Sequence, residues 1–85
     1  MAQVVVYSAG FCPYCDRAKA LLQRKGVAFE EIKVDHDPAQ RARMVERTGR
    51  STVPQVFIGT IHVGGFTELY ALERDGRLDA LLAGA

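Results

Sequence analysis

The sequence predicts an α/β fold in which helices flank a four-stranded mixed sheet, in the order β-α-β-α-β-β-α. Three observations predict it. Short β-branched runs alternate with amphipathic stretches in the first half, and two apolar runs separated by a two-residue turn follow in the second half. Two cysteines three positions apart stand where the first run gives way to the first helical stretch. With 85 residues the chain has room for one modest core, so we expect a single domain over residues 1–85.

The first strand and the first helix are predicted from their apolar patterns. Residues 3–8 contain the β-branched run Val4-Val5-Val6, which is typical of a buried strand. In the stretch that follows, one face of the expected helix carries Ala18, Leu21 and Leu22. Gly26 comes directly after this stretch and suits the end of a helix.

A second strand and a second helix are predicted next. Residues 29–34 are predicted to form a second strand, and the right-handed crossover rule places this strand parallel to the first. Asp37-Pro38 then suits a helix start, with Asp37 as the cap and Pro38 as the first helical residue. We expect Met44 and Val45 to face inward and Gly49 to end the helix.

The second half predicts a hairpin and a final helix. Residues 56–58 and 61–63 are short apolar strands joined by Gly59-Thr60, a spacing that favours an antiparallel two-residue hairpin. Gly64-Gly65 ends the second of these strands. Residues 68–73 are helical in pattern, and the last apolar face of the chain comprises Leu78, Leu81 and Leu82.

Charge and hydropathy exclude several classes of function. Lys and Arg number 11 against 10 for Asp and Glu, a balance that gives no electrostatic reason to expect a nucleic-acid or membrane partner. No apolar run reaches the length of a transmembrane helix. The N-terminus lacks the basic and long apolar regions of a signal peptide, so we expect a cytoplasmic protein.

The motif Cys12-Pro13-Tyr14-Cys15 predicts a thiol–disulfide active site. Unpaired N–H groups and the helix dipole at a helix N-terminus stabilise a thiolate at Cys12, and the thiolate is the attacking species. The spacing lets Cys15 attack a mixed disulfide formed at Cys12. A structural zinc site needs four ligands, and neither His36 nor His62 has the spacing to complete one, so we expect no metal. A structural metal site and a pair of inert thiols are the alternatives to the redox interpretation.

Two further segments extend this motif into a family resemblance. Thr52-Val53-Pro54 precedes the third strand, and Gly64-Gly65-Phe66-Thr67 precedes the third helix. With the cysteine motif, they resemble the three signature segments of the dithiol glutaredoxins, above all the short single-domain bacterial type-3 class. The resemblance covers essentially the whole chain. It implies a thioredoxin-like fold and the activity of a glutathione-dependent thiol–disulfide oxidoreductase.

The resemblance also implies the residues of the site. Cys12 and Cys15 are the catalytic pair, and glutathione is the co-substrate. The glutathione groove is implied to consist of Tyr14, Arg41, Thr52, Val53, Pro54, Gly65, Phe66 and Thr67. Within it, Pro54 is expected to follow a cis bond, and the Val53 backbone to pair with the cysteinyl part of glutathione.

The two carboxylates of glutathione are assigned in the same way. The backbone of Phe66 and the hydroxyl of Thr67 are expected to hold the γ-glutamyl carboxylate, at a helix start that offers free N–H groups. Arg41 is expected to contact the glycine carboxylate. The chain departs from the usual family pattern at Ala9, where many members have lysine, and at Asp16, where a histidine or basic residue is frequent.

The implied reaction divides the work between the cysteines. Cys12 alone is expected to reduce protein–glutathione mixed disulfides, and both cysteines to reduce protein disulfides, such as that of ribonucleotide reductase. We expect a monomer. Two rival functions are a redoxin that depends on thioredoxin reductase and a carrier of a glutathione-ligated iron–sulfur cluster. Tyr14 and Gly64-Gly65-Phe66-Thr67 argue against the first rival, and Pro13 argues against the second.

Overall fold

A computed structural model describes residues 2–84 and contains four strands and four helices. In chain order these are β1 (Val4–Ser8), α1 (Pro13–Arg24), β2 (Glu30–Lys33), α2 (Pro38–Thr48), β3 (Gln55–Ile58), β4 (Ile61–Gly64), α3 (Phe66–Arg74) and α4 (Leu78–Leu82). The sheet order is β2-β1-β3-β4, with β1 parallel to β2 and the other two pairs antiparallel. The predicted mixed sheet and its hairpin are confirmed. None of the helices within residues 2–84 is long and apolar enough to cross a membrane.

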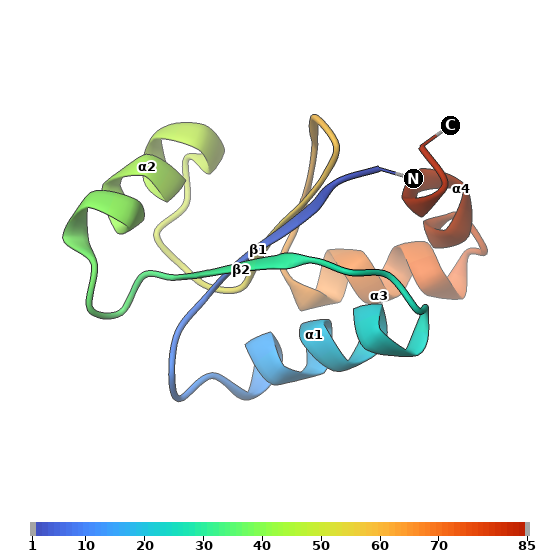
Figure 1. The fold of residues 1–85 in the computed structure, drawn as a ribbon, viewed down its shortest axis with the longest axis horizontal. Coiled ribbons are helices and arrows are strands. Elements are labelled where there is room, and N and C mark those ends of the chain that lie inside the picture. Colours follow the sequence, from blue (N-terminus) through green and yellow to red (C-terminus); the bar gives the residue numbers. More distant parts are fainter. Residues whose placement is uncertain (1, 85) are drawn as a thin grey trace.

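Helices cover both faces of the sheet (Figure 1). Successive residues of β1 point to opposite faces, so Val4 and Val6 enter one hydrophobic cluster and Tyr7 enters another. The first cluster lies against α1, α3 and α4, and the second lies against α2 through Met44. Because α2 is the one helix on its side, that face of the sheet is less covered than the other.

The second helix begins and ends as its sequence predicts, but one inward residue was assigned wrongly. Asp37 Oδ1 accepts the Gln40 N–H at 3.1 Å, and Gly49 has φ of 71° at the helix end. Met44 is fully buried, whereas Val45 is 38% exposed. Consecutive residues of a helix are rotated by about 100°, so Met44 and Val45 do not share a face.

The end of the chain forms two helices where the sequence pattern predicted one. Gly76 has φ of 73°, in the left-handed region that ends a helix, and it separates α3 from α4. The Arg77 N–H donates to the Leu72 carbonyl at 2.9 Å and closes this turn. The turn brings Leu78 and Leu82 into the cluster on the α1 side of the sheet. The third helix also begins earlier than predicted, at Phe66.

Candidate active site

The two cysteines occupy different environments at the start of α1. Cys12 is the N-cap residue, is partly exposed, and its Sγ accepts the Cys15 N–H at 3.1 Å. Cys15 lies in the first turn and is fully buried. The pair is joined as a disulfide, with a Cα–Cα distance of 5.1 Å. Cys12 is therefore the sulfur that a substrate can reach. Among residues 2–84, no group of three or more His, Cys, Asp or Glu side chains could hold a metal ion.

The loop that delivers Cys12 is attached to the end of β2. The Gly10 N–H donates to Asp35 Oδ2 at 3.0 Å, and this hydrogen bond lowers the pKa of Asp35. A Cβ at residue 10 would lie 3.1 Å from the same oxygen, so glycine permits the close approach. Asp35 is a positioning residue that the sequence analysis missed, because it lies 25 positions from its partner.

The segment before β3 faces Cys12. The Val53–Pro54 bond is cis, as the resemblance implied. The Val53 carbonyl oxygen lies 3.8 Å from Cys12 Sγ, and Pro54 is buried beside it. This loop therefore places backbone groups next to the reactive sulfur, where an extended peptide-like substrate can pair with them.

A pocket of about 220 Å³ opens next to this loop. Its lining includes every predicted groove residue except Arg41, together with residues that were not predicted: Arg50, Gln55 and Glu68. The Arg41 Nη1 instead donates to the Ser51 carbonyl at 2.7 Å, so Arg41 lies beside the loop that carries Thr52. Segments far apart in sequence thus meet at one pocket beside Cys12.

Glu68 organises the start of α3 on the wall of this pocket. Its Oε1 accepts the Gly65 N–H at 2.9 Å and the Arg50 Nη1 at 2.9 Å. The Gly65 hydrogen bond and then the Arg50 contact lower the pKa of Glu68. A glutamate three residues after the N-cap is a recognised capping signal, so this role of Glu68 could have been predicted from the sequence. Gly64 has φ of 113°, and a Cβ there would overlap the Glu68 carboxylate.

Two aromatic side chains, Tyr14 and Phe66, line the pocket, and Tyr70 packs beside Phe66. The Tyr14 and Phe66 rings lie 6.3 Å apart, and those of Phe66 and Tyr70 lie 5.8 Å apart. The Arg17 guanidinium lies 5.2 Å from the centre of the Tyr14 ring. Tyr14 and Tyr70 are about half exposed. The site therefore presents an apolar rim with a cation at one end.

A buried hydrogen-bonded chain supports the loop from behind. Gln55 is 1% exposed, and its Nε2 donates to the Thr52 carbonyl at 3.0 Å. On the other side, the Gln55 Oε1 lies 2.7 Å from His62 Nε2, which makes the imidazole the donor. The His62 ring also stacks on Phe57 at 5.0 Å. Burial, and next the nearby Arg50 charge, lower the pKa of His62. The sequence predicts no redox role for His62, and these contacts form only in the packed structure.

Paired substitutions of His62 separate its hydrogen bond from its ring. His62→Phe keeps an aromatic on Phe57 but leaves Gln55 Oε1 unpaired, so we expect urea unfolding at pH 7 to show a loss of about 1–3 kcal/mol. His62→Gln restores an amide donor and should lie closer to the wild type. Equal stabilities of the wild type and both variants would contradict the supporting role.

The lowered pKa of His62 predicts that the stability of the protein depends on pH, and the same variants test this. The folded-state pKa of His62 lies below the ordinary histidine pKa of about 6.5. At a pH just below about 6.5, the folded protein therefore binds fewer protons than the unfolded chain. Wild-type stability should therefore fall as the pH drops through this window. His62→Gln should lack this component of the fall, which urea unfolding at pH 7 and pH 5 measures.

Comparison with known proteins gives a consistent match. The family model described as Glutaredoxin matches residues 4–63. A glutaredoxin of Pseudomonas aeruginosa is 57% identical over 98% of this chain and 99% of its own length. Glutaredoxin 3 of Escherichia coli K12 is 54% identical over 96% of this chain and 99% of its own length. The crystal structure of a buckwheat glutaredoxin–glutathione complex superposes with a TM-score of 0.89, at 36% identity, over 98% of this chain and 78% of that one.

Proposed function

Because the chain belongs to the glutaredoxin family, a family of glutathione-dependent thiol–disulfide oxidoreductases, we propose that Cys12 and Cys15 carry out this activity with glutathione bound in the 220 Å³ pocket. The observation that carries the proposal is the partly exposed Cys12 sulfur, 3.8 Å from the Val53 carbonyl at the edge of that pocket. The buckwheat relative was solved as a glutathione complex.

In our proposal, glutathione lies extended between the loop before β3 and the start of α3. Its cysteinyl backbone pairs with Val53, and Thr52 and Pro54 complete that wall. Its γ-glutamyl carboxylate accepts from the Phe66 N–H and the Thr67 hydroxyl, because the first N–H groups of a helix lack partners within it.

The charged residues around the pocket suit the remaining groups of the tripeptide. The Glu68 carboxylate lines the pocket beside the start of α3 and matches the α-ammonium of the γ-glutamyl group. Arg41 has one N–H on Ser51 and retains other donors for the glycine carboxylate at the rim. Tyr14 lies along the side of the sulfur.

The first reaction uses Cys12 alone. Its thiolate attacks the glutathione sulfur of a protein–glutathione disulfide, and the protein thiolate leaves and takes up a proton. The thiolate of a second glutathione then attacks the Cys12 adduct on the bound glutathione sulfur. This step forms glutathione disulfide and regenerates the Cys12 thiolate, so one free glutathione is consumed for each mixed disulfide cleaved, and the other half of the glutathione disulfide comes from the substrate. The Cys15 N–H that reaches Cys12 Sγ stabilises the thiolate formed in this cycle.

The second reaction also uses Cys15. Cys12 attacks a protein disulfide and forms a mixed disulfide with the protein. Cys15 then attacks the Cys12 sulfur, releases the reduced protein, and leaves the Cys12–Cys15 disulfide that two glutathione molecules reduce again. The 5.1 Å between the two Cα atoms suits this closure.

We further propose the setting of this chemistry. The substrates are glutathionylated proteins and proteins with accessible disulfides, such as ribonucleotide reductase, and the chain acts as a monomer and a single domain. Glutaredoxin potentials of about −200 to −230 mV lie near the cytosolic glutathione potential, which supports a cytoplasmic location.

One coupled assay tests the proposed function. The protein, a glutathionylated substrate and NADPH are combined with either glutathione plus glutathione reductase or thioredoxin reductase alone. We expect turnover only with the glutathione system. Turnover supported by thioredoxin reductase alone would instead establish the rival redoxin function, and visible absorbance bands in freshly purified protein would favour the iron–sulfur carrier.

A substitution of Thr67 tests the binding pocket. Thr67→Ala removes the hydroxyl proposed to hold the γ-glutamyl carboxylate at an exposed site, so the Michaelis constant for glutathione should rise by about three- to tenfold with little change in kcat. Thr60→Ala, in the exposed turn between β3 and β4, is the matched control and should behave as the wild type. A Michaelis constant that is unchanged in Thr67→Ala would exclude this carboxylate position.

A further inference from the structure

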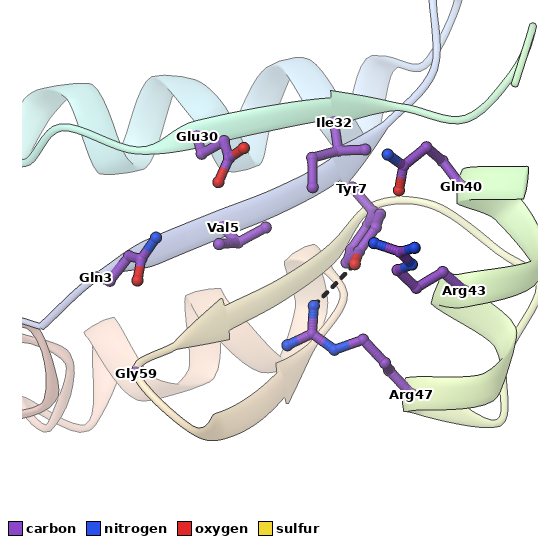
Figure 2. Close-up of a pocket in the computed structure, with 9 residues that line it drawn as sticks. All are labelled: Gln3, Val5, Tyr7, Glu30, Ile32, Gln40, Arg43, Arg47 and Gly59. Atoms are coloured by element: carbon purple, nitrogen blue, oxygen red, sulfur yellow. Dashed lines mark hydrogen bonds between the residues drawn. The ribbon is translucent and has the colours of Figure 1, made fainter.

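A second and larger pocket, of about 370 Å³, lies on the α2 face of the sheet (Figure 2). Its floor contains Val5 and Ile32, which are half-buried, and the buried ring of Tyr7. Its volume falls in the range of small-molecule sites. None of its lining residues belongs to the lining of the glutathione pocket, so it constitutes a separate site.

Two arginines form a cationic wall on one side of this pocket. Arg43 and Arg47 are four residues apart on α2, and their guanidinium groups extend over the sheet toward Tyr7 (Figure 2). Arg47 Nη1 donates to Tyr7 Oη at 2.8 Å, and Arg47 Cζ lies 4.0 Å from the centre of the Phe57 ring. Neither arginine forms a salt bridge with a carboxylate in the described part of the chain. Like charges at this helical spacing destabilise each other, and an anion between them removes that cost.

Polar side chains complete the lining of this pocket and orient a ligand in it. Gln40 also lines the pocket, and its buried Oε1 has no hydrogen-bond partner among the described residues. Because this atom exposes essentially no surface, the side-chain amide has to rotate before a ligand donor can reach it. Glu30 lies two residues from Ile32 along β2, about 7 Å away along the strand. Its carboxylate repels a ligand anion and accepts from a ligand hydroxyl or ammonium group.

We propose that this pocket binds a small organic anion whose carboxylate or phosphate lies between Arg43 and Arg47. The apolar body of the ligand lies on Val5 and Ile32, and a hydrogen-bond donor at its far end meets Glu30. The charge of the wall, the apolar floor and the acceptor at Glu30 together define this class of ligand. Inorganic phosphate satisfies only the first of these features.

The test is a titration of the isotopically labelled protein followed by backbone amide chemical shifts. The probes are 4-hydroxyphenylacetate and 4-hydroxyphenyl phosphate, which separate the carboxylate from the phosphate form of the ligand. Tyrosol, a neutral analogue of the first probe, and inorganic phosphate are the control compounds. We expect saturable shifts in β1, β2 and α2 with at least one organic anion, and weaker binding of tyrosol and inorganic phosphate.

Substitutions assign the binding to the arginine pair. Arg43→Gln should weaken binding of the organic anion about tenfold, the effect of one charge-assisted hydrogen bond. The Arg43 side chain forms no hydrogen bond or salt bridge with another residue in the range 2–84, so this substitution leaves the fold intact. Arg24→Gln, an exposed arginine at the end of α1 on the opposite face, should have no effect. The proposal would be overturned if neither organic anion gave saturable shifts, or if tyrosol bound as tightly as 4-hydroxyphenylacetate. It would also be overturned if inorganic phosphate bound as tightly as the organic anions, which would indicate an adventitious ion only, or if Arg24→Gln weakened binding as much as Arg43→Gln. Glutathione-dependent turnover should not change in Arg43→Gln, so this test is independent of the proposed function.

Discussion

Cys12→Ser is expected to lose all thiol-transfer activity, toward mixed disulfides and protein disulfides alike. Cys12 is the exposed member of the pair, and its sulfur receives the Cys15 N–H at the helix start. A serine hydroxyl is not ionised at neutral pH and does not attack sulfur, so the rate should fall by several orders of magnitude to the uncatalysed background. The glutathione-reductase-coupled assay with a small mixed disulfide measures this loss.

The control for Cys12→Ser is a measurement of its stability, which shows whether the variant is folded. Serine is close to cysteine in size and its hydroxyl is a good N-cap acceptor, so urea unfolding should give a stability near that of the reduced wild type. Substantial residual turnover in a folded Cys12→Ser protein would move the nucleophile to another residue.

Cys15→Ser is expected to divide the two activities. Deglutathionylation of a small mixed disulfide should continue, because the Cys12 cycle consumes one free glutathione and does not use Cys15. Reduction of a protein disulfide should fall to the background rate, because the mixed disulfide between Cys12 and the protein has no internal thiol to resolve it. Parallel assays with both substrates measure the ratio of deglutathionylation activity to protein-disulfide reduction activity.

A direct observation complements these rates. Cys15→Ser incubated with a protein disulfide should accumulate a covalent adduct at Cys12, visible by mass spectrometry and reversed by dithiothreitol. Equal loss of activity toward both substrates, without an adduct, would contradict the one-cysteine cycle. Because Cys15 is fully buried, unfolding measurements on the same variant separate loss of chemistry from loss of structure.

Both sides of the sheet were predictable from local patterns in the sequence. The alternation in β1 places Val4 and Val6 opposite Tyr7, and Gly59-Thr60 forms the expected antiparallel hairpin. The start of α2 was predictable for the same reason, since Asp37 caps a backbone N–H three residues away. The cysteine pair belongs with these features, because both sulfurs lie within one helical turn.

The boundaries that failed depended on small local choices. The sequence pattern joined α3 and α4 because their apolar residues continue across Gly76, and the positive φ of that glycine divides them. Val45 was assigned inward because it is apolar, although its rotation from Met44 turns it outward.

By itself the sequence determined the fold class, the cysteine pair and, through the three signature segments, seven of the ten residues that line the pocket. Only the tertiary structure decided which side chains support them. The Arg50–Glu68 pair spans 18 positions, the Gly10–Asp35 contact spans 25, and Arg47 reaches Tyr7 across 40. A helix or strand pattern repeats within a few residues and is visible in the chain, whereas these partners meet only after the sheet and helices have packed.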